Sequence, residues 1–67
     1  MIKVTINSKN YDFNQNTTID NLLAQLNLEK SKIAVEINLS LIPRSKYNTT
    51  IVENNDKIEI VTFVGGG

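Results

Sequence analysis

The chain has 67 residues, 40% of them hydrophobic, and its seven basic and seven acidic side chains give a formal net charge of zero. A chain this short forms one domain and buries only about 60% of the surface that its unfolded form exposes, so no deep pocket is expected. The absence of histidine and cysteine excludes thiol nucleophiles, thiolate metal ligands, disulfides and a persulfide on the chain itself. We therefore predict that the chain is not an enzyme, with no catalytic residue and no metal or cofactor bound by the chain itself.

Charge and hydropathy also limit the partners. Nucleic-acid binding requires a clustered basic face, and the balanced charge predicts none. No apolar run approaches the roughly 20 residues that span a bilayer, and residues 1–4 run straight into a strand-like pattern with no secretory signal. These features predict a cytoplasmic domain, monomeric when free, that binds neither nucleic acid nor membranes.

The first 14 residues predict a β-hairpin. Apolar and polar residues alternate in residues 2–6 and again in 11–14, on either side of a turn-forming cluster at 7–10. This alternation is typical of two strands that each bury one face.

A helix is predicted next. From Ile19 to Leu26, apolar side chains recur at the i, i+3, i+4 and i+7 positions of one helix face. Thr18 is the expected N-cap, and Asn27 is the expected left-handed residue at the C-terminal end.

Two further strands follow the helix. Ile33–Ile37 alternates again, and residues 39–42 form a short strand that Pro43 ends, because proline lacks a backbone donor. Residues 44–50 are polar and predict a short turn or a single helical turn. Within them, Tyr47 is expected to cover the core with its hydroxyl in water.

The last strand is predicted over residues 57–64. If Ile58 and Ile60 face the core, then Thr62 and Val64 share their side, and the intervening side chains point outward. Val61 and Phe63 would then form an apolar outer patch that docks a partner. The alternative, that a loop or the twist of the sheet covers Phe63, stays open.

The order of these elements predicts an α+β domain in which one helix covers a mixed sheet of four to five strands. This is the β-grasp arrangement, with the first and last strands parallel and adjacent at the centre. The domain is predicted to occupy residues 1–64, followed by a flexible tail at 65–67. Its turns contain no glycine, so asparagine, which best tolerates positive φ, is expected to make them.

All three glycines lie in the predicted tail, Gly65, Gly66 and Gly67. Without side chains they form a thin thread that fits a narrow tunnel and presents a carboxylate free of steric cover. The terminal α-carboxyl group is ionised at neutral pH and is suited to attack the α-phosphorus of a nucleoside triphosphate. The resulting acyl-adenylate is open to a thiol or persulfide. The alternative, a frayed terminus without function, stays open at this point.

Four residues outside the glycine tail are candidates for contact with a partner. They are Val61, Phe63, Val64 and Arg44. Arg44 begins a polar turn and is suited to an acidic partner surface, although simple solvation explains its position more economically.

Six short motifs distributed along the whole chain are informative together. They are Ile2-Lys3-Val4, Thr18-Ile19 before Leu22-Leu23, Val35-Glu36-Ile37-Asn38, Ile42-Pro43-Arg44 with Tyr47, Asp56-Lys57-Ile58-Glu59-Ile60, and Phe63-Val64-Gly65-Gly66-Gly67. In order, spacing and total length they resemble the ThiS family, the sulfur carriers of thiamine biosynthesis. One departure is Asn54-Asn55, where the family commonly has glycine; asparagine adopts the same backbone conformation.

The resemblance implies a β-grasp carrier whose terminal Gly67 is adenylated by a ThiF-type adenylyltransferase that uses ATP, and is then converted to a thiocarboxylate. A persulfide sulfur donor among the partner proteins supplies the sulfur, and the thiocarboxylate passes it to thiazole synthase. Gly66 is implied as the required neighbour of the modified residue, and Gly65 as part of the tail.

Two other functions remain compatible with the residues. One is another β-grasp sulfur carrier, serving molybdopterin, cysteine or methionine synthesis, with the same chemistry up to the acceptor. The other is a non-catalytic ubiquitin-like module, either a protein modifier or a TGS-like ligand-binding domain. A ligand-binding module has no use for a free glycine carboxylate, so its activity should survive loss of the tail.

Overall fold

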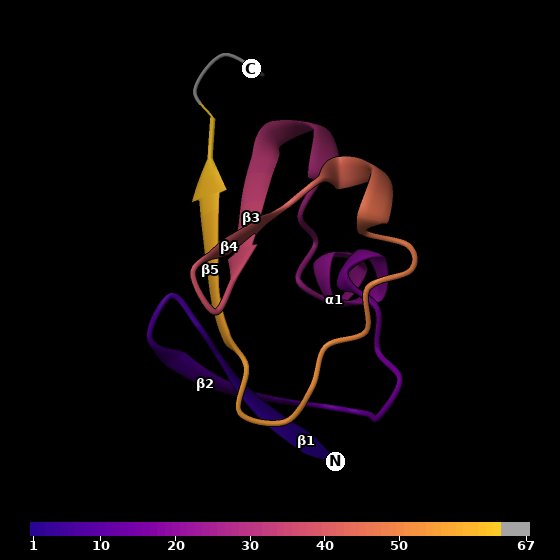
Figure 1. The fold of residues 1–67 in the computed structure, drawn as a ribbon, viewed down its shortest axis with the longest axis vertical. Coiled ribbons are helices and arrows are strands. Elements are labelled where there is room, and N and C mark those ends of the chain that lie inside the picture. Colours follow the sequence, from indigo (N-terminus) through magenta and orange to yellow (C-terminus); the bar gives the residue numbers. More distant parts are fainter. Residues whose placement is uncertain (64–67) are drawn as a thin grey trace.

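The computed structural model describes residues 1–63, in which five strands form one sheet in the order β2-β1-β5-β3-β4 (Figure 1). The strands are β1 (Ile2–Ile6), β2 (Lys9–Phe13), β3 (Ile33–Ile37), β4 (Ser40–Ile42) and β5 (Lys57–Thr62). The helix α1 (Ile19–Gln25) and two 3-10 turns, Lys30–Lys32 and Arg44–Lys46, complete the described part. The predicted tail and the predicted boundary at residue 64 lie outside the described residues.

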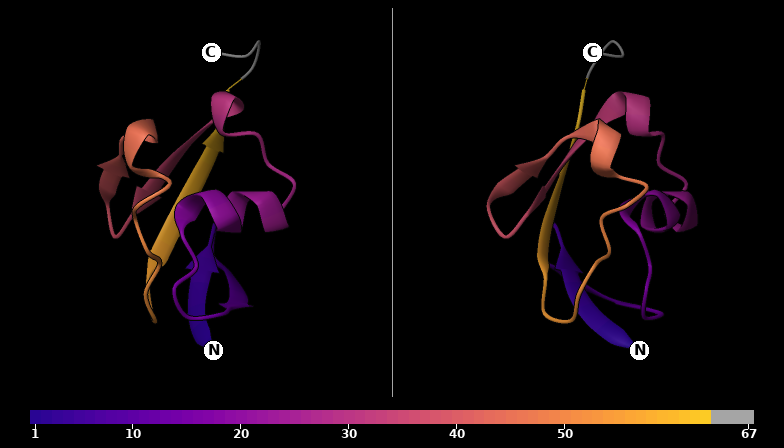
Figure 2. Two further views of the ribbon diagram at one scale, coloured as in Figure 1. Left: turned by 90° about the vertical axis from the view of Figure 1, so that its right-hand side faces the viewer. Right: turned by 45° about the vertical axis from the view of Figure 1, so that its right-hand side comes forward.

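The sheet is mixed because its first and last strands run parallel. β1 and β5 pair in parallel through Thr5 with Lys57 and Ile6 with Ile58, whereas the other neighbouring strands pair antiparallel. Figure 2 shows α1 to one side of the strands. These observations confirm the α+β class and the β-grasp arrangement, with five strands and one covering helix.

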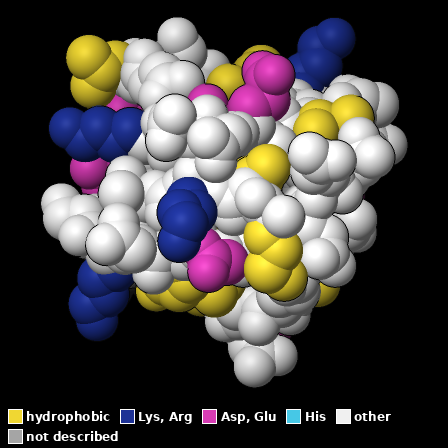
Figure 3. Space-filling view, turned by 90° about the horizontal axis from the view of Figure 1, so that it is seen from below, with side chains coloured by type: hydrophobic (Ala, Val, Ile, Leu, Met, Phe, Trp, Pro, Cys, Tyr) yellow, Lys and Arg dark blue, Asp and Glu magenta, His cyan; other side chains and the backbone are white. Residues whose placement is uncertain are grey.

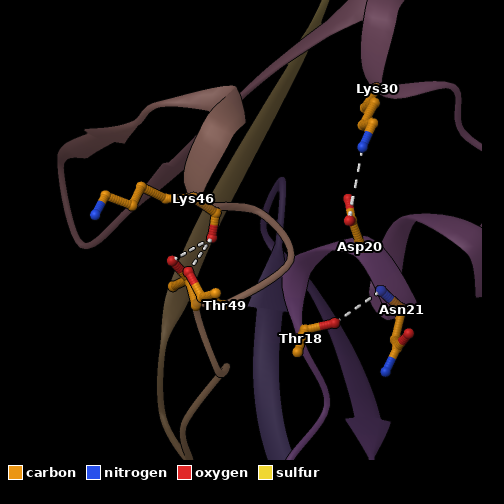
Figure 4. Close-up of polar contacts among 7 residues, drawn as sticks. Thr18, Asp20, Asn21, Lys30, Lys46 and Thr49 are labelled. Atoms are coloured by element: carbon orange, nitrogen blue, oxygen red, sulfur yellow. Dashed lines mark hydrogen bonds and ion pairs between the residues drawn. The ribbon is translucent and has the colours of Figure 1, made fainter.

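The helix α1 begins where the sequence predicts. The Thr18 hydroxyl oxygen accepts a hydrogen bond of 3.2 Å from the Asn21 backbone N–H (Figure 4), which satisfies one of the donors that a first helical turn leaves unpaired. Asn27 has a φ of 58° and confirms the predicted left-handed end of the helix. An ion pair of 3.7 Å between Asp20 and Lys30 (Figure 4) links α1 to the turn before β3.

The hydrophobic core lies between α1 and the sheet face that it covers. Apolar side chains at alternate positions of β1, β3 and β5 point into it, which confirms the predicted two-residue periodicity. The buried members are Ile2, Val4, Ile6, Phe13, Ile19, Leu22, Leu23, Ile33, Val35, Ile37, Tyr47, Val52, Ile58 and Ile60.

The prediction that Tyr47 covers the core was wrong, because only 2% of its surface is exposed and it belongs to the core itself. Its backbone carbonyl accepts a hydrogen bond of 3.1 Å from the N–H of Asp20 in α1. Further along, Ile19 N–H donates to the Thr50 carbonyl (3.0 Å), and Val52 N–H donates to the Thr17 carbonyl (2.8 Å). The segment after β4 is therefore bonded to the start of α1, and this long-range pairing draws the tyrosine inward.

Asparagine makes most of the turns, as the absence of glycine predicts. Five of the seven residues with positive φ in residues 1–63 are asparagines, which tolerate this region better than other non-glycine residues. They are Asn7, Asn16, Asn27, Asn38 and Asn55. The side chains of two of them also form hydrogen bonds with the backbone of β5. Asn7 binds the backbone of Ile60, and Asn38 accepts a hydrogen bond from the Lys57 N–H (2.9 Å).

Candidate functional site

The outward face of β5 carries the apolar patch that the sequence predicts. Ile58 and Ile60 are buried, whereas Val61 is 58% exposed and Phe63 is 39% exposed. The predicted alternation is therefore confirmed for Ile58, Ile60 and Val61. β5 ends at Thr62, so Phe63 lies just beyond the strand, and the described part of the chain covers it only partly. Thr62 shares the inward side but is exposed, although its cross-strand partner Ile33 is buried. Val64, the fourth predicted contact, lies outside the described residues.

Hydrogen bonds fix the end of β5 on both sides. The Phe63 N–H donates a hydrogen bond of 2.8 Å to the carbonyl of Lys32, in the turn before β3. On the other side, the Asn7 amide accepts from the Ile60 N–H (2.8 Å) and donates to the Ile60 carbonyl (3.0 Å). Both contacts join positions far apart in the sequence, so Ile60 and Phe63, near the end of the described residues, have a defined place on the sheet.

Arg44 lies at the same end of the sheet as Phe63. β4 and β5 both pair antiparallel with β3, so they run in the same direction, and the turn that contains Arg44 follows β4 directly. Figure 1 shows this turn and the end of β5 at the upper end of the molecule, with β3 between them. Arg44 is exposed and takes part in none of the three ion pairs found within residues 1–63.

The described residues hold no group of three or more acidic, histidine or cysteine side chains placed to bind a metal. Among them, no helix has the length and apolar character needed to cross a membrane. On the face shown in Figure 3, lysine and arginine side chains lie apart from one another, with acidic side chains between them. That face therefore carries no continuous basic surface of the kind that nucleic acids require.

Sequence reasoning missed two features of the outer sheet face. Glu36 and Glu59 lie directly opposite each other on β3 and β5, and Leu41, which is 67% exposed, lies opposite Glu36 on β4. The hairpin tip also holds Leu39, 85% exposed and with a φ of 71°. A pattern of alternation indicates which side chains share a face, but not which residues of two strands become neighbours, because that depends on register.

The ThiS family model matches residues 4–67, which is nearly the whole chain. The chain belongs to the ThiS family. The match includes β5 with Val61, Phe63 beyond it and all three terminal glycines. The resemblance given by the six motifs is therefore confirmed.

Individual relatives agree with this assignment. The chain is 40% identical over 63 residues to the sulfur carrier protein ThiS of Bacillus subtilis, covering 92% of this chain and 96% of that protein. The crystal structure of the thiamine biosynthesis protein ThiS from Geobacter metallireducens matches with a TM-score of 0.83 and 26% identity, over 98% of this chain and 100% of that one.

A different kind of relative is the thiazole synthase of Paramagnetospirillum magneticum, to which 66 residues are 41% identical. These residues are 98% of this chain but only 20% of the synthase. A region similar to this ThiS-family chain thus forms about a fifth of a larger protein of that name.

Proposed function

We propose that this chain is a sulfur carrier in thiamine biosynthesis and that its C-terminal Gly67 carries the sulfur as a thiocarboxylate. The observation that carries the proposal is the family match, which runs through residue 67 and includes the three glycines. The relative that this chain covers almost end to end is itself named a sulfur carrier.

The chemistry that we propose takes place at the terminal carboxylate. One of its oxygens attacks the α-phosphorus of ATP, and pyrophosphate leaves. The terminal sulfur of a partner's persulfide then attacks the acyl carbon and displaces AMP, giving an acyl disulfide. A thiol cleaves that disulfide by exchange and releases the thiocarboxylate.

The division of labour between this chain and its partners follows from its composition. Because the chain has no cysteine, the persulfide must belong to another protein, and without histidine the chain has no side chain whose unperturbed pKa lies near neutral pH. We propose a ThiF-type adenylyltransferase that binds ATP and a separate persulfide donor. In this scheme the chain binds no cofactor of its own and acts as a co-substrate.

Thiazole synthase is the proposed acceptor of the sulfur. Two proteins with this name, from Paramagnetospirillum magneticum and Magnetococcus marinus, contain regions 41% and 33% identical to this chain. A carrier and an acceptor that are joined in one polypeptide meet at a high effective concentration. Their occurrence in one chain therefore supports a direct contact between the separate proteins.

We propose that the exposed patch next to the tail makes the protein contacts. Val61 and Phe63 are the apolar residues of this patch, and Val64 continues it in the sequence. Arg44, at the same end of the sheet, is proposed to contact an acidic group of the partner. Exposed apolar side chains at such a place favour docking, since their burial on binding is favourable.

The test is the intact mass of the protein after incubation with ATP, a ThiF-type adenylyltransferase and a persulfide source. We expect the mass to rise by the difference between sulfur and oxygen, and fragmentation to place the change at Gly67. Localisation is essential because oxidation of Met1 gives the same nominal change. An unmodified terminus, with the enzyme shown to be active on another carrier, would contradict the proposal.

A further inference from the structure

The outer face of the sheet contains two carboxylates that face each other without a cation. In the register of β3 and β5, Glu36 lies directly opposite Glu59, where Cβ atoms are about 4.5–5.5 Å apart. Both residues are partly buried. Like charges placed directly opposite each other destabilise a sheet, so this pair is unfavourable in the free chain.

No ion pair within residues 1–63 neutralises these two carboxylates. The three that are present join lysines to Asp12, Asp20 and Glu29 instead. Lys57 lies two residues before Glu59 on the same face of β5, but it forms no ion pair with either glutamate. The described part of the chain therefore leaves two neighbouring negative charges for another molecule to match.

The carboxylates are flanked by exposed apolar side chains on two sides. Leu41 of β4 lies opposite Glu36, and Val61 follows two positions after Glu59, on the same face of β5. Phe63 lies two positions after Val61, just beyond β5 and at the end of the described chain. The acidic pair is thus continuous with the apolar patch next to the predicted tail, over a strip of about 14 Å along β5.

We propose that this strip docks the adenylating enzyme, which inserts an arginine or lysine between Glu36 and Glu59 and packs apolar side chains against Val61 and Leu41. The inference rests on the proposed function and deepens it by naming what the enzyme recognises. An enzyme that binds the polyanion ATP carries positive charge around its active site, and an acidic face near the tail steers the carrier toward it. A second copy of this chain fits poorly, because pairing this face with itself would bring four carboxylates together.

The test compares three substitutions that each remove one negative charge. Glu36→Gln and Glu59→Gln alter the pair, and Glu53→Gln alters an exposed glutamate in the loop before β5. For each protein, the Kd for a ThiF-type adenylyltransferase is measured at low and high salt, together with the Kd for thiazole synthase and the melting temperature.

We expect either change in the pair to raise Kd by about tenfold or more, because it leaves the enzyme's buried cation partly unpaired. The melting temperature should stay the same or rise, because the repulsion between the glutamates is removed. Glu53→Gln should change Kd less than about twofold, as expected for a charge outside the interface. The wild-type affinity should also fall more steeply with salt than that of either pair variant.

Three outcomes would overturn this inference without affecting the proposed function. An unchanged Kd for both pair variants, in a chain that is still adenylated, would refute the docking role and leave the proposed function intact. Equal weakening by all three substitutions would indicate net charge rather than a local contact. Weaker binding to thiazole synthase alone would refute the choice of partner. Failure of the wild-type chain to be adenylated at all would instead overturn the proposed function, and this inference with it.

Discussion

On β5, the inward side chains Ile58 and Ile60 are buried in the core, whereas the outward side chains Glu59 and Val61 are partly or largely exposed. Burial of apolar surface contributes about 25 cal/mol per Å², so the inward face accounts for much of what the strand adds to stability. The outward face adds little and places unfavourable charges side by side. The inner face of this one strand thus builds the domain, whereas the outer face is the one that we propose to dock a partner.

The largest effect is expected from a deletion that removes the proposed reactive end and leaves both faces of β5 in place. A chain lacking Gly66 and Gly67 should lose adenylation completely, because the carboxylate no longer reaches the enzyme's nucleotide. The fold should survive, because the described core ends before these residues. Mass spectrometry after the ATP reaction and a thermal melt followed by circular dichroism measure the two properties. Equal adenylation of the shortened chain would refute the assignment of the tail.

A second prediction compares the two faces directly. Ile58→Ala should lower the free energy of unfolding by about 2–5 kcal/mol, because it leaves a cavity in the core. Val61→Ala, on the opposite face, should change it by less than about 0.5 kcal/mol. Urea denaturation of both variants measures the difference. Similar losses for the two variants would show that the outer face is also structural.

A third prediction concerns Phe63, whose side chain is partly exposed at the end of the strip. Phe63→Ala should raise the Kd for the adenylating enzyme or for thiazole synthase by about tenfold, as expected for an aromatic contact residue. The free energy of unfolding should fall by less than the loss of about 3–5 kcal/mol expected for a fully buried phenylalanine, because 39% of the residue is already exposed. A large drop in melting temperature with unchanged affinity would place Phe63 in the core.

A fourth prediction tests what holds the outward face in position. Asn7→Gly keeps a residue that accepts the φ of 49° but removes both hydrogen bonds to the Ile60 backbone. The expected loss is about 1–2 kcal/mol of unfolding free energy. Hydrogen exchange should also become faster at the Ile60 amide. If exchange at Ile60 does not change, then the side chain of Asn7 does not hold the strand.

Most of the architecture was predictable because it depends on local patterns. Alternation identified the strands, the apolar stripe and Thr18 identified α1, and the lack of glycine in the domain indicated turns made by asparagine. The burial of Tyr47 and the pairing of Glu36 with Glu59 were not predictable in the same way. Both depend on which distant segments become neighbours, and composition along a short window carries no information about register.

The two hydrogen bonds between the Asn7 side chain and the Ile60 backbone were missed for the same reason, since 53 positions separate the two residues. The signal in the sequence was only an asparagine in a turn, which its positive φ explains without any further role. The part of the candidate site that alternation could predict was the outward direction of Val61. What surrounds this side chain required the sheet order and the pairing of β3 with β5.

The smallest expected effect concerns the strained hairpin tip, where Leu39 has a φ of 71° and is 85% exposed. The left-handed backbone conformation costs a non-glycine residue about 1–2 kcal/mol. Glycine avoids this strain, but it loses more conformational entropy on folding, which cancels part of the gain. Leu39→Gly should therefore raise the free energy of unfolding by about 0.5–1 kcal/mol, measured by urea denaturation. If the same change weakens binding of the adenylating enzyme, then the surface that docks the enzyme extends to the hairpin tip. If stability falls instead, the leucine makes a contact that outweighs its backbone strain.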